Sequence, residues 1–106
     1  MNKLISVIIP VFNVEKYIRD CIDSLTIQVV AGFSFEESVE VIFIDDGSPD
    51  NSVEIIREYQ NTYKNIYIIQ QENAGQSVAR NNAIKIASGE YVFFLDSDDL
   101  LPPDAL

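Results

Sequence analysis

Leu4–Val11 reads LISVIIPV, and this stretch indicates the fold class. It is apolar almost throughout, which is typical of a strand in a parallel sheet whose two faces are both covered. A helical pattern follows directly, because apolar residues recur at the spacing that places them on one side of a helix. These residues are Val14, Ile18, Cys21, Ile22 and Leu25. The chain is therefore predicted to begin with a strand and an amphipathic helix.

The alternation of strand and helix continues along the chain. Further strands are predicted at Val39–Ile44, Ile66–Gln70 and Tyr91–Leu95, the last as a buried strand. Ile27–Ser38 is interpreted as a loop. The resulting order, βαβαβαβ, predicts an α/β fold with a mostly parallel, Rossmann-like sheet and flanking helices. Residues 1–106 are expected to form a single domain with one core.

Two helices are predicted between the later strands. The first has Ser48 as its N-cap and Pro49 at its first position, and it extends to about Tyr63. Its inner face is expected to carry Val53, Ile56 and Tyr63. The second helix is Gln76–Ser88, closed by Gly89. Its inner face is expected to carry Ala79, Ala83, Ile86 and Ala87.

The overall charge restricts the kinds of partner. The chain has 17 acidic and 7 basic residues, a formal net charge of -10. This charge argues against binding to nucleic acid or to an anionic membrane surface. A single cysteine and no histidine argue against a disulfide framework and against zinc. The first apolar run is too short for a signal peptide or a membrane span, so we expect a cytoplasmic location. Contact with the inner face of a membrane is expected only through segments outside this chain.

Ligands of parallel α/β sheets bind beyond the carboxyl ends of the strands. Polar residues gather at these ends, in the stretches Pro10–Asn13, Asp45–Ser48, Gln71–Gly75 and Asp96–Asp99. The last stretch has three carboxylates within four positions, directly after an apolar run. Such carboxylates repel one another unless a positive group lies between them, which favours a hard divalent cation that holds phosphates. The alternative is an acidic helix N-cap, but a cap needs one acid.

Other positions at these ends have two interpretations each. The Asp46 carboxylate can accept the imide N–H of uracil, or Asp46 and Asp45 can form an Asx-turn. Phe12 offers a flat face for stacking on a base, or belongs to the core. Gly75 allows close approach of a ligand, or forms a plain turn. Arg80 can bind a diphosphate, or can pair with one of the acids.

Four segments in register resemble the inverting, nucleotide-sugar-dependent glycosyltransferases of family 2, which have the GT-A fold. The segments are SVIIPVFN at Ser6–Asn13, VIFIDDGSPDNS at Val41–Ser52, the N-x-G-x-x-x-A-R-N stretch at Asn73–Asn81, and GEYVFFLDSDD at Gly89–Asp99. Two features depart from the family pattern. Phe12 stands where many relatives have Tyr, and the loop Ile27–Ser38 is longer than usual.

The resemblance implies that the chain is the donor-binding, N-terminal part of a catalytic domain that is cut at its C-terminal end. It implies a UDP-sugar donor and a saccharide acceptor in cell-surface polysaccharide synthesis. Asp96-Ser97-Asp98 matches the family's DXD motif, in which Asp98 would bind Mn²⁺ or Mg²⁺ and Asp96 would reach the ribose or the metal. Asp99 would support this site or cap a helix. The nucleotide-binding set implied is Pro10, Phe12, Asp46, Asn73, Gly75, Arg80, Asp96 and Ser97.

No catalytic residue is assigned within the chain, and the catalytic base is expected beyond Leu106. Two alternatives stay open. VFFLDSDDLL resembles the first motif of haloacid-dehalogenase-type phosphatases, with Asp96 as nucleophile and Asp98 as acid. Against this, position 99 is Asp rather than Thr or Val, and about ninety residues precede the motif. The other alternative is a non-catalytic nucleotide-binding module.

Overall fold

The computed structural model describes residues 3–72, 76–102 and 105–106, and only the backbone at positions 76, 77, 79 and 80. The strands are β1 (Ile5–Val11), β2 (Val39–Asp45), β3 (Ile66–Gln70) and β4 (Tyr91–Phe94). The helices are α1 (Glu15–Thr26), α2 (Phe35–Ser38), α3 (Ser52–Thr62) and α4 (Gln76–Ile86). The predicted order of strands and helices is confirmed, with α2 as an addition.

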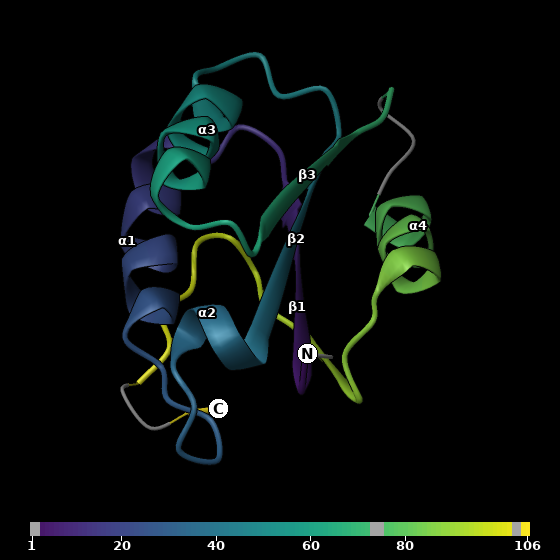
Figure 1. Cartoon of the computed structure of the whole chain (residues 1–106). Coiled ribbons are helices and arrows are strands. Elements are labelled where there is room, and N and C mark those ends of the chain that lie inside the picture. Colours follow the sequence, from purple (N-terminus) through teal and green to yellow (C-terminus); the bar gives the residue numbers. More distant parts are fainter. Residues whose placement is uncertain (1–2, 73–75, 103–104) are drawn as a thin grey trace.

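The four strands form one parallel sheet in the order β3-β2-β1-β4. Helices α1, α2 and α3 lie on one side of the sheet and α4 lies on the other (Figure 1). This arrangement confirms the predicted α/β class. It also explains why β1 and β2 are apolar on both faces, because each of their faces is covered by a helix.

The core has two parts, one on each face of the sheet. The larger part contains Val7, Ile9 and Val11 of β1 together with the inner face of α1. The smaller part contains Ile8, Ile42 and Ile44, packed against Ala83 of α4. Alternate residues of a strand point to opposite faces, so neighbours in the sequence divide between the two parts. Burying each of these aliphatic side chains stabilises the fold by about 1.5–3 kcal/mol.

The strands do not end at the same level. β1 pairs with β2 along its whole length, from Ile5 opposite Val39 to Val11 opposite Asp45. β4 pairs with only the first part of β1, and Phe94 lies opposite Ile8. Since a strand rises by about 3.3 Å per residue, the segment after β4 begins about 10 Å before the end of β1.

The prediction that β4 is buried was wrong. Its four residues, Tyr91, Val92, Phe93 and Phe94, are 38–69% exposed, and the first buried residue is Leu95, one position beyond the strand. Among the described residues, β4 is an edge strand of the sheet and its neighbour is β1. An apolar sequence indicates a preference for burial, but it does not specify which element packs against the strand.

Two predicted helix boundaries were also wrong. α3 begins at Ser52 rather than after Ser48, and its N-cap is Asn51. The Ser48 hydroxyl is engaged elsewhere, because it donates to the carbonyl of Val11 and accepts from the backbone N–H of Asn13. α4 ends at Ile86 rather than at Ser88. Ile86 is 51% exposed, so its predicted place on the inner face was wrong.

Part of the predicted loop at residues 27–38 is a short helix. The Ser34 hydroxyl accepts from the backbone N–H of Glu37, and the Glu37 side chain accepts from the backbone N–H of Ser34. This reciprocal capping box begins α2. The sequence contains the S-x-x-E pattern of a capping box at Ser34 and Glu37. A helix of four residues is too short to show a helical pattern of apolar residues as well.

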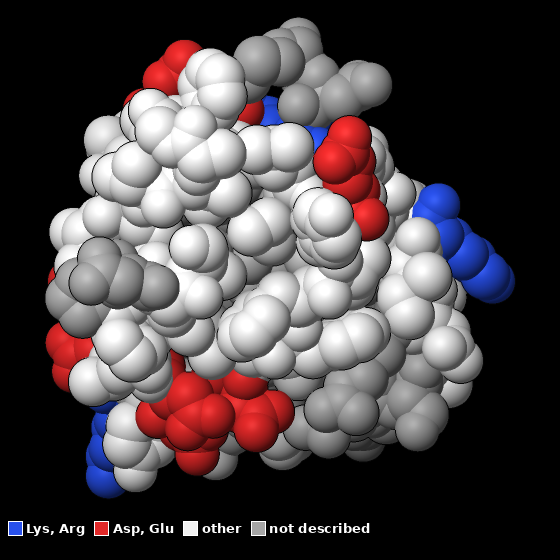
Figure 2. Space-filling view, turned by 90° about the horizontal axis from the view of Figure 1, so that it is seen from below, with Lys and Arg blue, Asp and Glu red and all other residues white. Residues whose placement is uncertain are grey.

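The surface agrees with the acidic composition. Figure 2 views the side of the molecule on which both labelled termini lie in Figure 1. Much of this face is uncharged, and acidic groups gather near its rim. In the part of the chain that the structure describes, no helix is both long enough and apolar enough to cross a membrane.

Candidate functional site

The carboxyl end of β1 presents one aromatic side chain. Phe12 is 51% exposed, which excludes the interpretation as a core residue and is compatible with a stacking role. Pro10 is buried within the strand. Asn13 follows with a φ of 57°, a left-handed conformation that asparagine tolerates. This turn directs the chain into α1 and leaves the Phe12 side chain at the edge of the sheet.

The two acids at the end of β2 have different environments. Asp45 is 4% exposed, and its carboxylate accepts the backbone N–H of Ser48 at 3.1 Å. Gly47 has a φ of 81°, which completes the tight turn. Asp46 is half-buried, and its backbone N–H donates to the carbonyl of Val11 at 3.0 Å. Asp45 therefore closes the turn, and Asp46 is the acid placed beside the end of β1.

Two residues that the sequence did not single out hold Asp46. The side-chain amide of Gln71 donates to the Asp46 carboxylate at 2.9 Å. The Asn82 amide of α4 donates to the Gln71 side-chain carbonyl at 3.0 Å, which fixes the orientation of the Gln71 amide. The Asp46 carboxylate is thus held from β3 and α4 together. Position 71 directly after a strand was the available signal, but a glutamine there is common without such a role.

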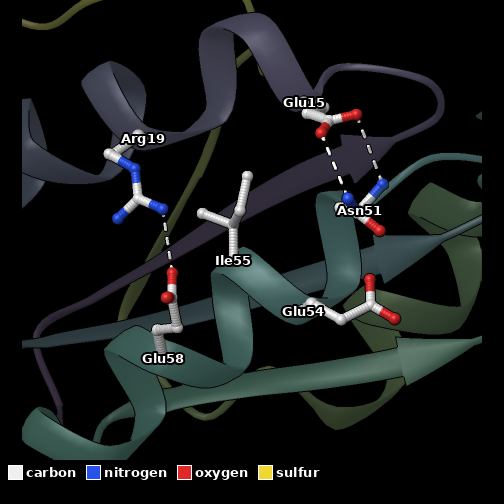
Figure 3. A pocket seen from close by; sticks show the side chains of 6 residues that line it. All are labelled: Glu15, Arg19, Asn51, Glu54, Ile55 and Glu58. Atoms are coloured by element: carbon white, nitrogen blue, oxygen red, sulfur yellow. Dashed lines mark hydrogen bonds and ion pairs between the residues drawn. The ribbon is translucent and has the colours of Figure 1, made fainter.

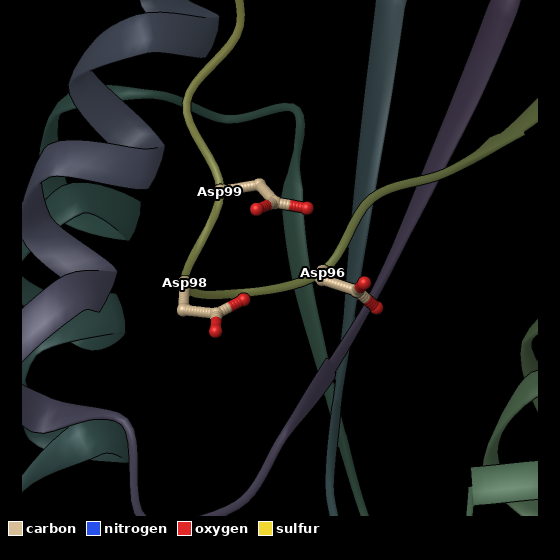
Figure 4. Close-up of side chains that lie close together, drawn as sticks. All are labelled: Asp96, Asp98 and Asp99. Atoms are coloured by element: carbon tan, nitrogen blue, oxygen red, sulfur yellow. The ribbon is translucent and has the colours of Figure 1, made fainter.

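The loop after β4 brings three carboxylates together. Asp96, Asp98 and Asp99 are all exposed, and one ligand oxygen from each lies within 4.8 Å of the others. The three side chains project from one curved loop (Figure 4). A hydrogen bond of 3.0 Å from the backbone N–H of Asp99 to the carbonyl of Asp96 closes this loop. The intervening Ser97 is buried, with 7% exposed. The sequence prediction of an acidic cluster here is confirmed.

The chain after this loop is anchored on α1. The backbone N–H of Leu101 donates to the Ser24 hydroxyl at 3.1 Å, and the Gln28 amide donates to the carbonyl of Pro102 at 2.8 Å. The pKa of Cys21, on the buried face of α1, also shows that the acidic loop lies near this helix. Burial raises the pKa of the Cys21 thiol to about 12, with further contributions from the charges of Asp99 and Asp98. The acidic loop therefore lies between β4 and α1.

A hollow between α1 and α3 is a separate feature (Figure 3). Four of its polar residues contact one another in pairs. Glu15 accepts from the backbone N–H and the side-chain amide of Asn51, and Arg19 pairs with Glu58 at 2.9 Å. Arg19 and Glu58 are more than half exposed, and such surface pairs contribute little to stability. These contacts hold α1 and α3 together, and we assign no ligand to the hollow.

Three predicted site residues fall outside what is described. Asn73 and Gly75 lie outside the described residues, and so does the side chain of Arg80 on α4. The others lie at the carboxyl side of the sheet: Phe12 and Asp46 follow neighbouring strands, and the acidic loop follows β4, which ends opposite Ile8 of β1. Their proposed contacts with a nucleotide stay predictions.

Known proteins resemble this chain in both sequence and fold. The profile of glycosyl transferase family 2 matches residues 6–106. A poly(ribitol-phosphate) beta-glucosyltransferase of Bacillus spizizenii is 42% identical over 104 residues, which are 96% of this chain and 16% of that protein. The structure of S. aureus TarS 1-349 in complex with UDP-GlcNAc superimposes with a TM-score of 0.84 at 37% identity, over 94% of this chain and 28% of that one.

A structure with lower sequence identity contains a metal ion. The mannosyltransferase PcManGT from Pyrobaculum calidifontis, in complex with GDP-Man and Mn²⁺, superimposes with a TM-score of 0.83 at 26% identity. The match covers 96% of this chain and 29% of that one, so this chain spans under a third of each of these three proteins. The family profile and the shared fold agree across nearly all of the 106 residues. The chain belongs to glycosyl transferase family 2.

Proposed function

We propose that this chain is the donor-binding part of an inverting glycosyltransferase that transfers a sugar from a UDP-sugar to a saccharide acceptor. The observation that carries the proposal is the cluster of Asp96, Asp98 and Asp99 beside the carboxyl edge of a family 2 sheet. The UDP-GlcNAc complex of TarS supports the choice of donor. The poly(ribitol-phosphate) beta-glucosyltransferase supports an acceptor in cell-surface polysaccharide synthesis.

The acidic loop suits a divalent cation by its donor chemistry. Carboxylate oxygens are the ligands that Mg²⁺ and Mn²⁺ prefer, and three of them lie within 4.8 Å of one another. Asp98 and Asp96 would hold the ion, with Asp99 in support. When bound, the ion supplies positive charge that stabilises a departing nucleoside diphosphate. Mn²⁺ in the PcManGT complex supports this assignment.

The levels of the strand ends suggest how the donor lies. The uracil would lie where β1 and β2 end. Asp46 would accept a hydrogen bond from its imide N–H, and Phe12 would stack on its ring. The acidic loop follows the neighbouring strand β4, which ends about 10 Å before the end of β1. A nucleoside diphosphate running from the end of β2 across β1 toward β4 would place its phosphates at that loop. Asn73, Gly75 and Arg80 are proposed to complete this donor site.

At this edge Asp46 and the three acids of the loop after β4 would serve the donor, and Asp45 closes a turn. Inversion also needs a base that deprotonates the acceptor hydroxyl on the face of the sugar opposite the leaving group. We propose that this base belongs to another part of the protein, and that residues 1–106 form the N-terminal, donor-binding unit. Transfer by this chain alone is accordingly not expected.

Isothermal titration calorimetry of the 106-residue chain with UDP, with and without Mn²⁺, tests the proposal. We expect measurable binding that strengthens about tenfold or more with Mn²⁺, because an ion held by Asp96 and Asp98 would offset the negative charge of the diphosphate. Equal affinity in both conditions would remove the metal from the site. Binding of UDP with no transfer by the full-length protein to any of a panel of saccharide acceptors would instead favour a non-catalytic nucleotide-binding module.

A further inference from the structure

A buried carboxylate lies far from the donor site and takes no part in it. Glu40 of β2 is 8% exposed and lies near the amino end of the sheet, opposite Ser6 of β1. One oxygen of Glu40 accepts three hydrogen bonds: from the Ser6 hydroxyl at 2.5 Å, from the backbone N–H of Ser88 at 2.9 Å, and from the Ser88 hydroxyl at 3.1 Å. A buried charge needs such compensation, since leaving it unpaired is costly.

The Ser6 hydroxyl extends this set of contacts to the next residue. It donates to Glu40 and accepts the backbone N–H of Gly89 at 2.8 Å. Gly89 lies so close to β1 that an added Cβ would come within 2.6 Å of the Ser6 nitrogen and 2.8 Å of the Ile5 carbonyl carbon. We predicted Gly89 as the residue that closes a helix. The structure shows instead a glycine required by close approach of two backbones.

These contacts hold the segment that leads into β4. Glu40, Ser6, Ser88 and Gly89, here called the Glu40 clamp, join β2, β1 and the α4–β4 connection. β4 itself is short, and within the described part of the chain its one strand neighbour is β1. Its four residues are 38–69% exposed, so their own burial specifies the register only weakly, and the first buried side chain is Leu95 just beyond the strand. A slip by one residue would turn every side chain of β4 to the opposite face.

We infer that the Glu40 clamp sets the register of β4 on β1 and thereby places the acidic loop, so that Glu40 is a positioning residue for the metal-dependent donor site. The metal part of this inference rests on the proposed function, and the register part does not. Ser88 and Gly89 lie just before β4, and Asp96 lies just after it. Displacing the entry of β4 therefore displaces the exit, where the carboxylates stand.

Four variants of the 106-residue chain separate positioning from general stability. Glu40→Ala removes the acceptor, and Gly89→Ala forces the backbones of β4 and β1 apart. Glu40→Gln keeps one acceptor oxygen and is the conservative variant. Glu54→Ala, at an exposed glutamate of α3, is the matched control.

The first measurement is hydrogen exchange at single amides, read by NMR. The Tyr91 and Leu95 amides donate to the carbonyls of Leu4 and Ile8, so they report the pairing of β4 with β1. The Val41 and Gln71 amides donate to the carbonyls of Asn65 and Asp45. They report the pairing of β2 with β3 and serve as the internal reference. We expect Glu40→Ala and Gly89→Ala to speed exchange at Tyr91 and Leu95 about tenfold or more relative to this reference. Glu40→Gln should retain most of the protection.

The second measurement is Mn²⁺ affinity, by electron paramagnetic resonance of the free ion. We expect a loss of about tenfold in Glu40→Ala and Gly89→Ala, the size typical for partners that orient metal ligands, and none in Glu54→Ala. Unchanged exchange at Tyr91 and Leu95, or equal acceleration at all four amides, would overturn the register role. Faster exchange in β4 with unchanged Mn²⁺ affinity would overturn the positioning role. If the unaltered chain binds no Mn²⁺, the proposed function fails, and the exchange rates still decide whether the clamp sets the register.

Discussion

The side-chain amide of Gln71 donates a hydrogen bond of 2.9 Å to the carboxylate of Asp46. Asn82 in turn fixes the Gln71 amide, so the acid proposed to read the base is held from β3 and α4. Asp45, one position earlier, is buried and closes the turn to Ser48. Two adjacent aspartates thus have different environments: Asp45 is buried in a turn, and Asp46 is half-buried and held by Gln71.

Asp46→Asn tests this division of roles. We expect the affinity for UDP to fall about tenfold, because a hydrogen bond to a charged acceptor contributes about 1.5–3 kcal/mol. The preference for UDP over CDP should narrow, since cytosine lacks the imide donor that the carboxylate would accept. Calorimetry with both nucleotides gives the ratio. Asp45→Asn is the comparison: it should lower the free energy of unfolding, and an equal loss of UDP preference in both variants would contradict the assignment.

Asp98→Asn and Asp99→Asn test the metal ligands. We expect Asp98→Asn to lower Mn²⁺ affinity at least tenfold and Asp99→Asn to have a smaller effect, because the first removes a charged ligand and the second a supporting acid. Electron paramagnetic resonance of Mn²⁺ measures both. Asp20→Asn, at an exposed acid of α1, is a control for the change in net charge. A larger loss in Asp99→Asn would move the ligand assignment by one position.

Asp50→Ala tests a contact that joins the starts of α1 and α3. The Asp50 carboxylate accepts the backbone N–H of Glu15 at 3.0 Å and both the N–H and the hydroxyl of Ser52. Desolvation raises the pKa of Asp50, but these hydrogen bonds outweigh it and leave the pKa below the ordinary 3.8. At pH 7 the variant should lose about 1 kcal/mol of unfolding free energy, the usual net contribution of an intramolecular hydrogen bond.

The pH dependence of this loss has a definite sign. A carboxyl whose pKa is lower in the folded chain stabilises it above the unfolded pKa, and this contribution disappears as pH falls through the folded pKa. The difference between Asp50→Ala and the unaltered chain should therefore narrow below about pH 4. Urea unfolding at pH 7 and pH 3 measures it. A gap that widened at pH 3 would be inconsistent with the lowered pKa.

The reactivity of Cys21 tests how the buried face of α1 is packed. Burial, and then Asp99 and Asp98, raise the pKa of its thiol to about 12. Since only the thiolate reacts, labelling with a thiol reagent at pH 8 should be slow in the native chain and rapid in denaturant. A raised pKa also means that Cys21 stabilises the fold fully below its unfolded pKa of about 8.5, and that this contribution is lost as pH rises toward 12. Rapid native labelling at pH 8 would contradict the burial of Cys21 in the core.

Much of the site could be anticipated from local patterns. Asp96 and Asp98 were singled out because carboxylates follow an apolar run, and the structure places them together at the end of β4. Gln71 and Asn82 were missed, because their importance depends on Asp46 being beside them in space. Glu40 was missed for the same reason: in the sequence it is an acid within an apolar strand, and its partners Ser6 and Ser88 lie 34 and 48 positions away.

The sequence by itself determined the order of strands and helices, the parallel α/β class and the edge where polar residues gather, since periodicity and turn residues act over short stretches. The tertiary structure alone decided that β4 is an exposed edge strand that ends opposite Ile8, and that Asp45 rather than Asp46 is buried. It alone decided that Gly89 must be small because β1 passes beside it. These properties arise from contacts between segments distant in the chain, and no local pattern of residues specifies which distant group will stand opposite.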